Sequence, residues 1–134
     1  MVGTQYKTNA GSVFSLKYHL VWCPKYRRKV PVGNVAVRLK ELLREKANQL
    51  DADIEALEIL PDHVHLFVCS DPTKAPQDLA NQFKGYTSRV LRQEFAHLRN
   101  RASALWSRSS DAGSIGHVSE ETVRKYIETQ EQRS

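Results

Sequence analysis

The spacing of hydrophobic positions along this 134-residue chain changes several times between two periods. Alternation of apolar and polar residues predicts a β-strand, because successive side chains of a strand point to opposite faces. Apolar residues three and four positions apart predict a helix. Alternation or short apolar runs predict strands over 14–22, 54–60, 63–69 and 110–115, and helical spacing predicts helices over 35–50, 79–95 and 119–130.

Several boundaries of these elements carry local signals. Asn34 is the expected N-cap of the first helix, because its side chain can accept a hydrogen bond from the first turn. Pro61-Asp62 is turn chemistry, so the strands on either side are expected to form a hairpin. The basic stretch 99–108 is expected to be irregular, and Ser119 is the expected N-cap of the last helix.

The predicted order is strand, helix, strand, strand, helix, strand, helix, in a chain whose length suits one domain. A ferredoxin-like split β-α-β arrangement closes this order into an α+β fold, with one antiparallel sheet and two helices on one face. The last helix, at about 119–130, is additional to that fold and follows a Gly-containing tether at 112–116. We therefore expect a single domain over residues 1–134.

Composition narrows the class of protein. Apolar residues make up 40%, and no run approaches the roughly 20 apolar residues of a membrane span. The first 12 residues lack the apolar stretch of a signal peptide, so a soluble cytoplasmic protein is expected. Cys23 and Cys69 form no CxxC pair, which argues against a zinc ribbon or a redox motif.

The segment Pro61 to Val68 contains the strongest chemical signal. His63 and His65 lie two positions apart on a predicted strand, so both point to the same face. Two adjacent imidazoles are typical of a divalent metal site, although the triplet alone has many false positives. The isolated histidines His19, His97 and His117 are interpreted as ordinary hydrogen-bonded residues.

The last helix offers a nucleophile and a further ligand. Tyr126 and Gln130 are four residues apart and share a helix face. A tyrosine hydroxyl is a weak nucleophile unless its target is activated, which a metal bound to a phosphate does. The Gln130 amide oxygen suits a third ligand position. Packing of an amphipathic helix is the alternative explanation for Tyr126.

A net charge of +5 is consistent with a polyanionic partner, and the cations are clustered. Lys25, Arg27, Arg28 and Lys29 surround one tyrosine in five residues. Beside a metal site, phosphate binding is the favoured interpretation of such a cluster, and a solvated loop is the alternative. The predicted DNA contacts are Lys25, Arg27, Arg28, Lys29, Lys84 and Arg89.

Most of the chain resembles the small single-strand-DNA transposases of insertion sequences, which are HUH nucleases with one catalytic tyrosine. The similar segments are YHLVWCPKYRRKV, LKELLREKA, EALEILPDHVHLFV, LWSRS and VSEETVRKYIETQ. Transposases associated with repetitive extragenic palindromes share these motifs. The chain departs from the pattern at Ser110-Asp111, where two aromatic residues are common in the family.

The resemblance implies that His63, His65 and Gln130 bind Mg²⁺ or Mn²⁺ and that Tyr126 is the nucleophile. It implies cleavage and rejoining of single-stranded DNA through a 5′-phosphotyrosine, without ATP. The implied partners are hairpins at the element ends, single-stranded target DNA and a second subunit that shares the active sites. A non-catalytic nucleic-acid-binding module and a rolling-circle or relaxase endonuclease are the alternatives.

Overall fold

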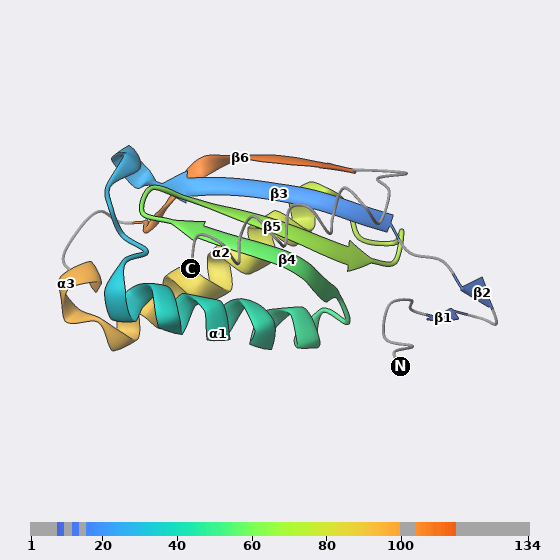
Figure 1. Cartoon of the computed structure of the whole chain (residues 1–134), viewed down its shortest axis with the longest axis horizontal. Coiled ribbons are helices and arrows are strands. Elements are labelled where there is room, and N and C mark those ends of the chain that lie inside the picture. Colours follow the sequence, from blue (N-terminus) through green and yellow to red (C-terminus); the bar gives the residue numbers. More distant parts are fainter. Residues whose placement is uncertain (1–7, 10–11, 14–15, 100–103, 115–134) are drawn as a thin grey trace.

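The computed structural model describes residues 8–9, 12–13, 16–99 and 104–114, with only the backbone described at 8–9, 12–13, 27 and 110–114. The elements, in chain order, are β1 (Thr8–Asn9), β2 (Ser12–Val13), β3 (Leu16–Pro24), the 3₁₀ turn η2 (Lys25–Arg27), α1 (Gly33–Gln49), β4 (Asp53–Leu60), β5 (His63–Ser70), α2 (Pro76–Glu94), α3 (Ala96–Arg99) and β6 (Trp106–Ser114) (Figure 1).

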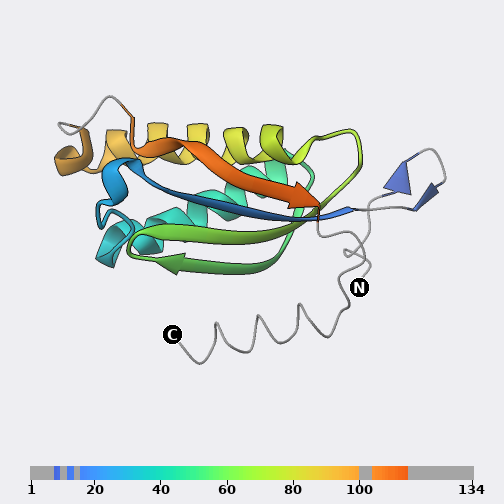
Figure 2. The same ribbon diagram turned by 90° about the horizontal axis from the view of Figure 1, so that it is seen from above.

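Four strands form one antiparallel sheet in the order β4-β5-β3-β6. The first strand, β3, lies beside the third, β5, and α1 and α2 cross the same face of the sheet (Figure 2). This arrangement confirms the predicted ferredoxin-like split β-α-β fold. The short pair β1-β2 forms a separate two-stranded sheet that the sequence pattern did not predict.

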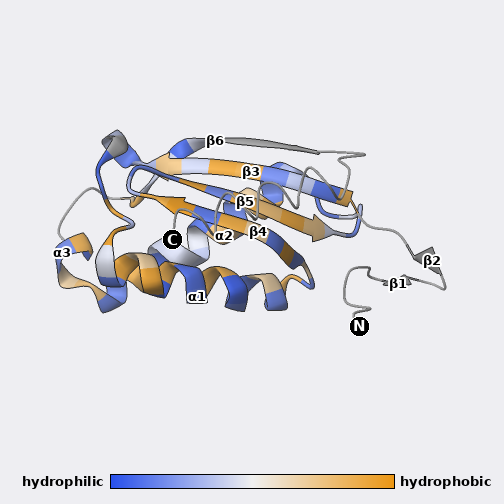
Figure 3. Ribbon diagram, viewed as in Figure 1, coloured by the Kyte–Doolittle hydropathy of each residue, from blue (hydrophilic) through white to orange (hydrophobic). Residues whose placement is uncertain are grey.

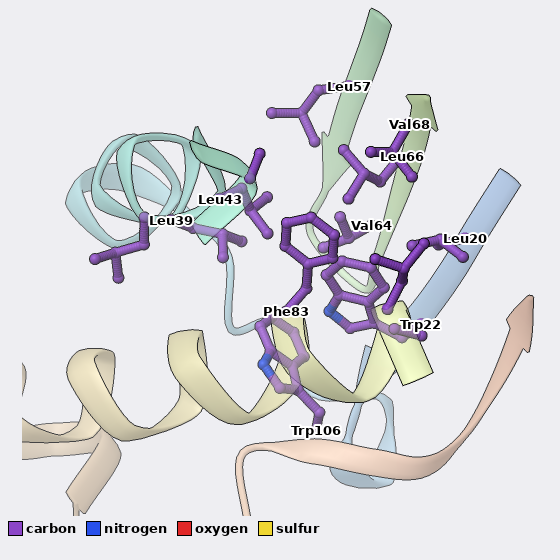
Figure 4. Packing of buried hydrophobic residues seen from close by; sticks show 14 of the residues in the cluster. Leu20, Trp22, Leu39, Leu43, Leu57, Val64, Leu66, Val68, Phe83 and Trp106 are labelled. Carbon is purple, nitrogen blue, oxygen red and sulfur yellow. The ribbon is translucent and has the colours of Figure 1, made fainter. Parts of the chain in front are cut away.

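The core lies between this sheet and the two long helices. Leu20 and Trp22 of β3 and Val64 of β5 meet Phe83 of α2 and Leu39 of α1, and all five side chains are at most 2% exposed (Figure 4). Hydrophobic and hydrophilic bands alternate along α1 and along the strands (Figure 3). The alternation that predicted the elements therefore also separates the covered sheet face from the opposite one.

The first helix begins differently from the prediction. Val32 occupies the N-cap position and makes no side-chain cap, while Asn34 is an exposed residue inside the first turn. The chain enters α1 through Gly33, whose φ of 57° lies in the left-handed region that glycine adopts without steric cost. Asn34 was predicted as the cap from its residue type, but Gly33 moves the helix start upstream.

The last strand also differs from the prediction. It begins at Trp106, four residues before the predicted start, so β6 takes up the end of the stretch 99–108 that was expected to be irregular. Trp106 is 4% exposed and its indole Nε1 donates to Thr87 Oγ1 at 2.9 Å. Packing of this ring edge-on against Trp22 fixes the strand start, which the local sequence does not mark because polar residues follow Trp106.

The predicted last helix at 119–130 lies outside the described residues. Among the described helices, none combines the length and apolarity needed to cross a membrane.

Candidate functional site: a histidine cluster on the sheet face opposite α1 and α2

Strand β5 sorts its side chains between the two faces of the sheet. Val64, Leu66 and Val68 are at most 1% exposed and face the helices. His63 and His65 therefore point to the other face, and their ring centroids are 4.7 Å apart with the planes at 71°. The turn at Pro61-Asp62 joins Leu60 directly to His63 in the hairpin, as predicted. The sequence thus predicted correctly that the two imidazoles are neighbours.

The ring of His63 is oriented by the residue before it. Its Nδ1 lies 2.7 Å from Oδ1 of Asp62, so a protonated Nδ1 donates to the carboxylate. This contact leaves Nε2 as the nitrogen with an available lone pair. A carboxylate behind an imidazole is the usual outer partner of a metal-binding histidine, because it fixes the tautomer and raises the basicity of the ligand.

The ring of His65 is oriented by a residue from the neighbouring strand. His19 of β3 places its Nε2 at 3.1 Å from Nδ1 of His65. The same His19 ring stacks on Phe67, with centroids 4.3 Å apart and planes at 2°. His19 is hydrogen-bonded, as the sequence analysis expected of it, but its partner is one of the two predicted metal ligands.

The electrostatic surroundings keep His65 neutral. Burial lowers its pKa from 6.5 to about 4, and the neighbouring His63 and His19 add to the shift. Neutral imidazole is the form that binds a metal ion. With Nδ1 of each ring engaged, both His63 and His65 can offer Nε2, so the donor set fits a divalent ion.

The described residues supply only part of a coordination shell. Within 16–26, 28–99 and 104–109, where side chains are described, no three His, Cys, Asp or Glu side chains converge as metal ligands. Glu58, the cross-strand neighbour of His65, is only 8% exposed and was not predicted. The predicted nucleophile Tyr126 and third ligand Gln130 lie outside the described residues.

The predicted basic cluster follows β3 at the end of the sheet where β5 begins. Trp22 pairs with Val64, the neighbour of His63, and the turn η2 begins at Lys25, three residues after Trp22. Side chains of Arg28 and Lys29 are exposed and that of Lys25 is half-buried. The backbone N–H of Lys25 donates to the Leu105 carbonyl at 3.0 Å, which ties the turn to the segment before β6.

The two predicted DNA contacts on α2 have different surroundings. Lys84 is 8% exposed and its ammonium donates to the carbonyls of Arg108 and Ser109 at 3.1 and 3.4 Å. Burial lowers the pKa of Lys84, consistent with a group enclosed between α2 and β6. Arg89 is exposed and its guanidinium lies 5.5 Å from the centre of the Tyr86 ring. These positions favour a structural role for Lys84.

Comparison with protein families decides the classification. Residues 12–130 match the family described as "Transposase IS200 like". The chain belongs to this family of transposases. The described histidine cluster and the predicted Tyr126 both fall inside the matched range.

Relatives of known class extend over nearly the whole chain. The ISDra2 transposase TnpA of Deinococcus radiodurans is 36% identical over 126 residues, covering 92% of this chain and 90% of that protein. The transposase for insertion sequence element IS200 of Salmonella typhimurium is 26% identical, covering 92% and 82%.

Solved structures share the fold. A crystal structure from Deinococcus radiodurans R1, assigned as a transposase, is 37% identical, with a TM-score of 0.75 and coverage of 92% of this chain and 97% of that one. A tyrosine transposase associated with REP sequences, bound to a REP hairpin, has a TM-score of 0.56 at 14% identity, covering 86% and 64%. The second likeness shows the fold alone.

Proposed function

We propose that this transposase cleaves and rejoins single-stranded DNA at insertion-sequence ends through a 5′-phosphotyrosine intermediate. Tyr126 is the nucleophile, and His63, His65 and Gln130 hold Mg²⁺ or Mn²⁺. One observation carries the proposal: two adjacent imidazoles on the sheet face opposite α1 and α2 have their Nδ1 atoms engaged by Asp62 and His19. The nitrogen ligands suit Mn²⁺ better than Mg²⁺.

The protein residues perform the covalent step. A bound divalent ion would withdraw charge from the scissile phosphate. The Tyr126 Oη forms a bond to phosphorus as the bond between phosphorus and the 3′ oxygen breaks. The phenol loses its proton, and the 3′ oxygen takes one up and leaves as a 3′-hydroxyl. The number of phosphoester bonds is unchanged.

Rejoining reverses this step. A 3′-hydroxyl of the same or another strand attacks the phosphotyrosine, and the Tyr126 oxygen leaves. Because the ester bond is conserved at each stage, no ATP is needed. This property lets one active site excise an element and insert it elsewhere.

Hairpins at the element ends are the proposed first substrate, with single-stranded DNA as the target. The fold neighbour bound to a REP hairpin supports this class of ligand. The exposed cations Arg28 and Lys29 lie at the sheet end where His63 begins β5, which supports phosphate contacts near the reacting strand. We further propose that the protein acts as a homodimer with shared active sites.

The proposal is tested by covalent trapping of labelled hairpin DNA on denaturing gels. Wild-type protein with Mn²⁺ should give a protein–DNA adduct, whereas Tyr126→Phe should bind the hairpin and give none. His63→Ala and His65→Ala should lose most of the adduct, as should EDTA. The matched control is His97→Ala, because His97 is an exposed histidine on α3 outside the cluster.

Two results would contradict the proposal. Full adduct formation in EDTA would remove the metal from the account. Tight hairpin binding by the wild type with no adduct under any metal would favour the non-catalytic nucleic-acid-binding module.

A further inference from the structure

Tyr26 is the most exposed large hydrophobic residue on the described surface. Its side chain is 70% exposed, although Tyr26 lies only two residues after Pro24, the buried last residue of β3. Its φ of 64° lies in the left-handed region, which is unfavourable for a bulky side chain. An exposed ring on a strained backbone contributes little to the packing of the core. The Tyr26 ring is therefore a candidate for binding a ligand.

Two cations of the same turn lie close to the Tyr26 ring. The ammonium of Lys25 and the guanidinium carbon of Arg28 each lie 5.6 Å from the centre of the Tyr26 ring. This separation is within the range of cation–π attraction, about 6 Å. The ring therefore has a preferred orientation, and it is bordered by groups that attract phosphates.

The turn beneath the ring is fixed at both ends. The Lys25 backbone N–H donates to the Leu105 carbonyl at 3.0 Å, and Pro24 before it is buried. On the other side Val30 is 4% exposed and belongs to the hydrophobic core. The ring stands on a short anchored segment, which lowers the entropy lost when a ligand binds.

The turn lies near the histidine cluster. Trp22 pairs with Val64, the residue after His63. Tyr26 is four positions after Trp22, so their Cα atoms are at most about 14 Å apart. A DNA strand whose phosphate reaches the cluster could thus place a nucleotide a few positions along the strand on this turn.

We propose that Tyr26 is a stacking platform for one unpaired base of the DNA strand, with Lys25 and Arg28 contacting the adjacent phosphates. Every base has an aromatic face, so the platform accepts any unpaired base and rejects paired ones whose faces are already covered. The choice of DNA as the ligand rests on the proposed function. The platform would recognise the junction between the hairpin and its single-stranded flank.

The test compares two DNAs and two substitutions in EDTA, so that no cleavage is required. One DNA is a hairpin with a single-stranded flank, and the other is the same hairpin without it. Tyr26→Asn removes the ring yet suits the left-handed turn, and Tyr26→Phe keeps the ring. Fluorescence anisotropy should show Tyr26→Asn weakening binding of the flanked hairpin by about 5- to 150-fold. Tyr26→Phe should bind within about twofold of wild type.

Two further readouts separate stacking from charge and from folding. Tyr26→Asn should leave the slope of log affinity against log salt unchanged, whereas Arg28→Ala should lower its magnitude by about 0.7–0.9. Tyr26→Asn should also melt at the same or a higher temperature, because asparagine tolerates the left-handed backbone. A 2-aminopurine scanned along the flank should be quenched at one position by wild type and not by Tyr26→Asn.

The inference is overturned if Tyr26→Asn binds the flanked hairpin as tightly as wild type. It is also overturned if the loss is equal for the hairpin without a flank, or if it accompanies a lower melting temperature. The adduct assay on wild-type protein tests the proposed function separately. A negative result for the Tyr26 platform therefore does not contradict the proposed cleavage reaction, and the reverse also holds.

Discussion

His19 shows how the site depends on a single residue of a neighbouring strand. Its Nε2 lies 3.1 Å from Nδ1 of His65, and its ring stacks on Phe67. If the His65 Nε2 is a metal ligand, His65 must carry its proton on Nδ1 and donate it to His19. Loss of that acceptor leaves the tautomer and the ring orientation of His65 unsupported.

His19→Phe should therefore weaken Mn²⁺ binding by about 10- to 100-fold while keeping the stack on Phe67. His19→Gln should restore most of the affinity, because its amide oxygen can accept from His65. Isothermal titration with Mn²⁺ measures both variants. Equal affinity of His19→Phe and wild type would show that His19 does not position the ligand.

The lowered pKa of His65 predicts a pH dependence of stability in the metal-free protein. The pKa is about 4 in the folded state, and the ordinary 6.5 returns on unfolding. Between these values the unfolded chain binds a proton that the folded protein does not, so stability is complete above about pH 6.5 and declines toward pH 4. Urea unfolding at pH 7, 5.5 and 4.5 should show a shallower decline for His65→Gln than for wild type. Parallel profiles would contradict the burial of a neutral ring.

Among the elements, α2 and β6 are joined by a buried ammonium. Lys84 donates to the carbonyls of Arg108 and Ser109, and Trp106, two residues before Arg108, donates to Thr87. These bonds hold the start of β6 against the helix. After β6 the sequence continues to the predicted catalytic helix. Because the Lys84 ammonium is buried and bonded to backbone carbonyls, we expect this contact to influence stability rather than DNA binding.

Lys84→Met keeps the aliphatic stem and removes the ammonium. It should reduce the free energy of unfolding by about 1.5–3 kcal/mol, the range for losing a hydrogen bond to a charged group. Hairpin affinity at a temperature where the variant is folded should change little. Arg89→Met is the control, because Arg89 is exposed on the same helix. Unaltered stability with a reduced salt slope would make Lys84 a phosphate contact.

The elements that the sequence predicted well are those with local signals. Alternation placed His63 and His65 on one face, and Pro61-Asp62 marked the hairpin that starts β5. The start of β6 was missed because it depends on Trp106 packing against Trp22, which no local pattern encodes. The partner of His19 was missed for a similar reason, since its contact with His65 depends on the register between β3 and β5.

At the scale of the whole molecule, the proposal concerns how two subunits share their active sites. The predicted last helix at 119–130 has few apolar residues and follows Gly113 and Gly116 in the sequence. Such a helix is poorly suited to stable docking on its own sheet. We expect it to complete the histidine cluster of the partner subunit.

Complementation tests this arrangement. Tyr126→Phe and the double variant His63→Ala/His65→Ala should each be inactive alone, and their mixture should regain cleavage because one composite site is intact. Subunit exchange is verified by co-purification of two differently tagged variants. An inactive mixture despite exchange would place each active site within one chain.

The central claim is the 5′-phosphotyrosine, and the position of the label in the trapped adduct tests it most directly. The same hairpin strand is labelled at its 5′ end in one sample and at its 3′ end in another, and each is incubated with wild-type protein and Mn²⁺. Attack by Tyr126 with release of a 3′-hydroxyl predicts that only the 3′ label migrates with the protein, while the 5′ label leaves on a shorter fragment. A protein band carrying the 5′ label, or an adduct of equal yield from Tyr126→Phe, would contradict the account.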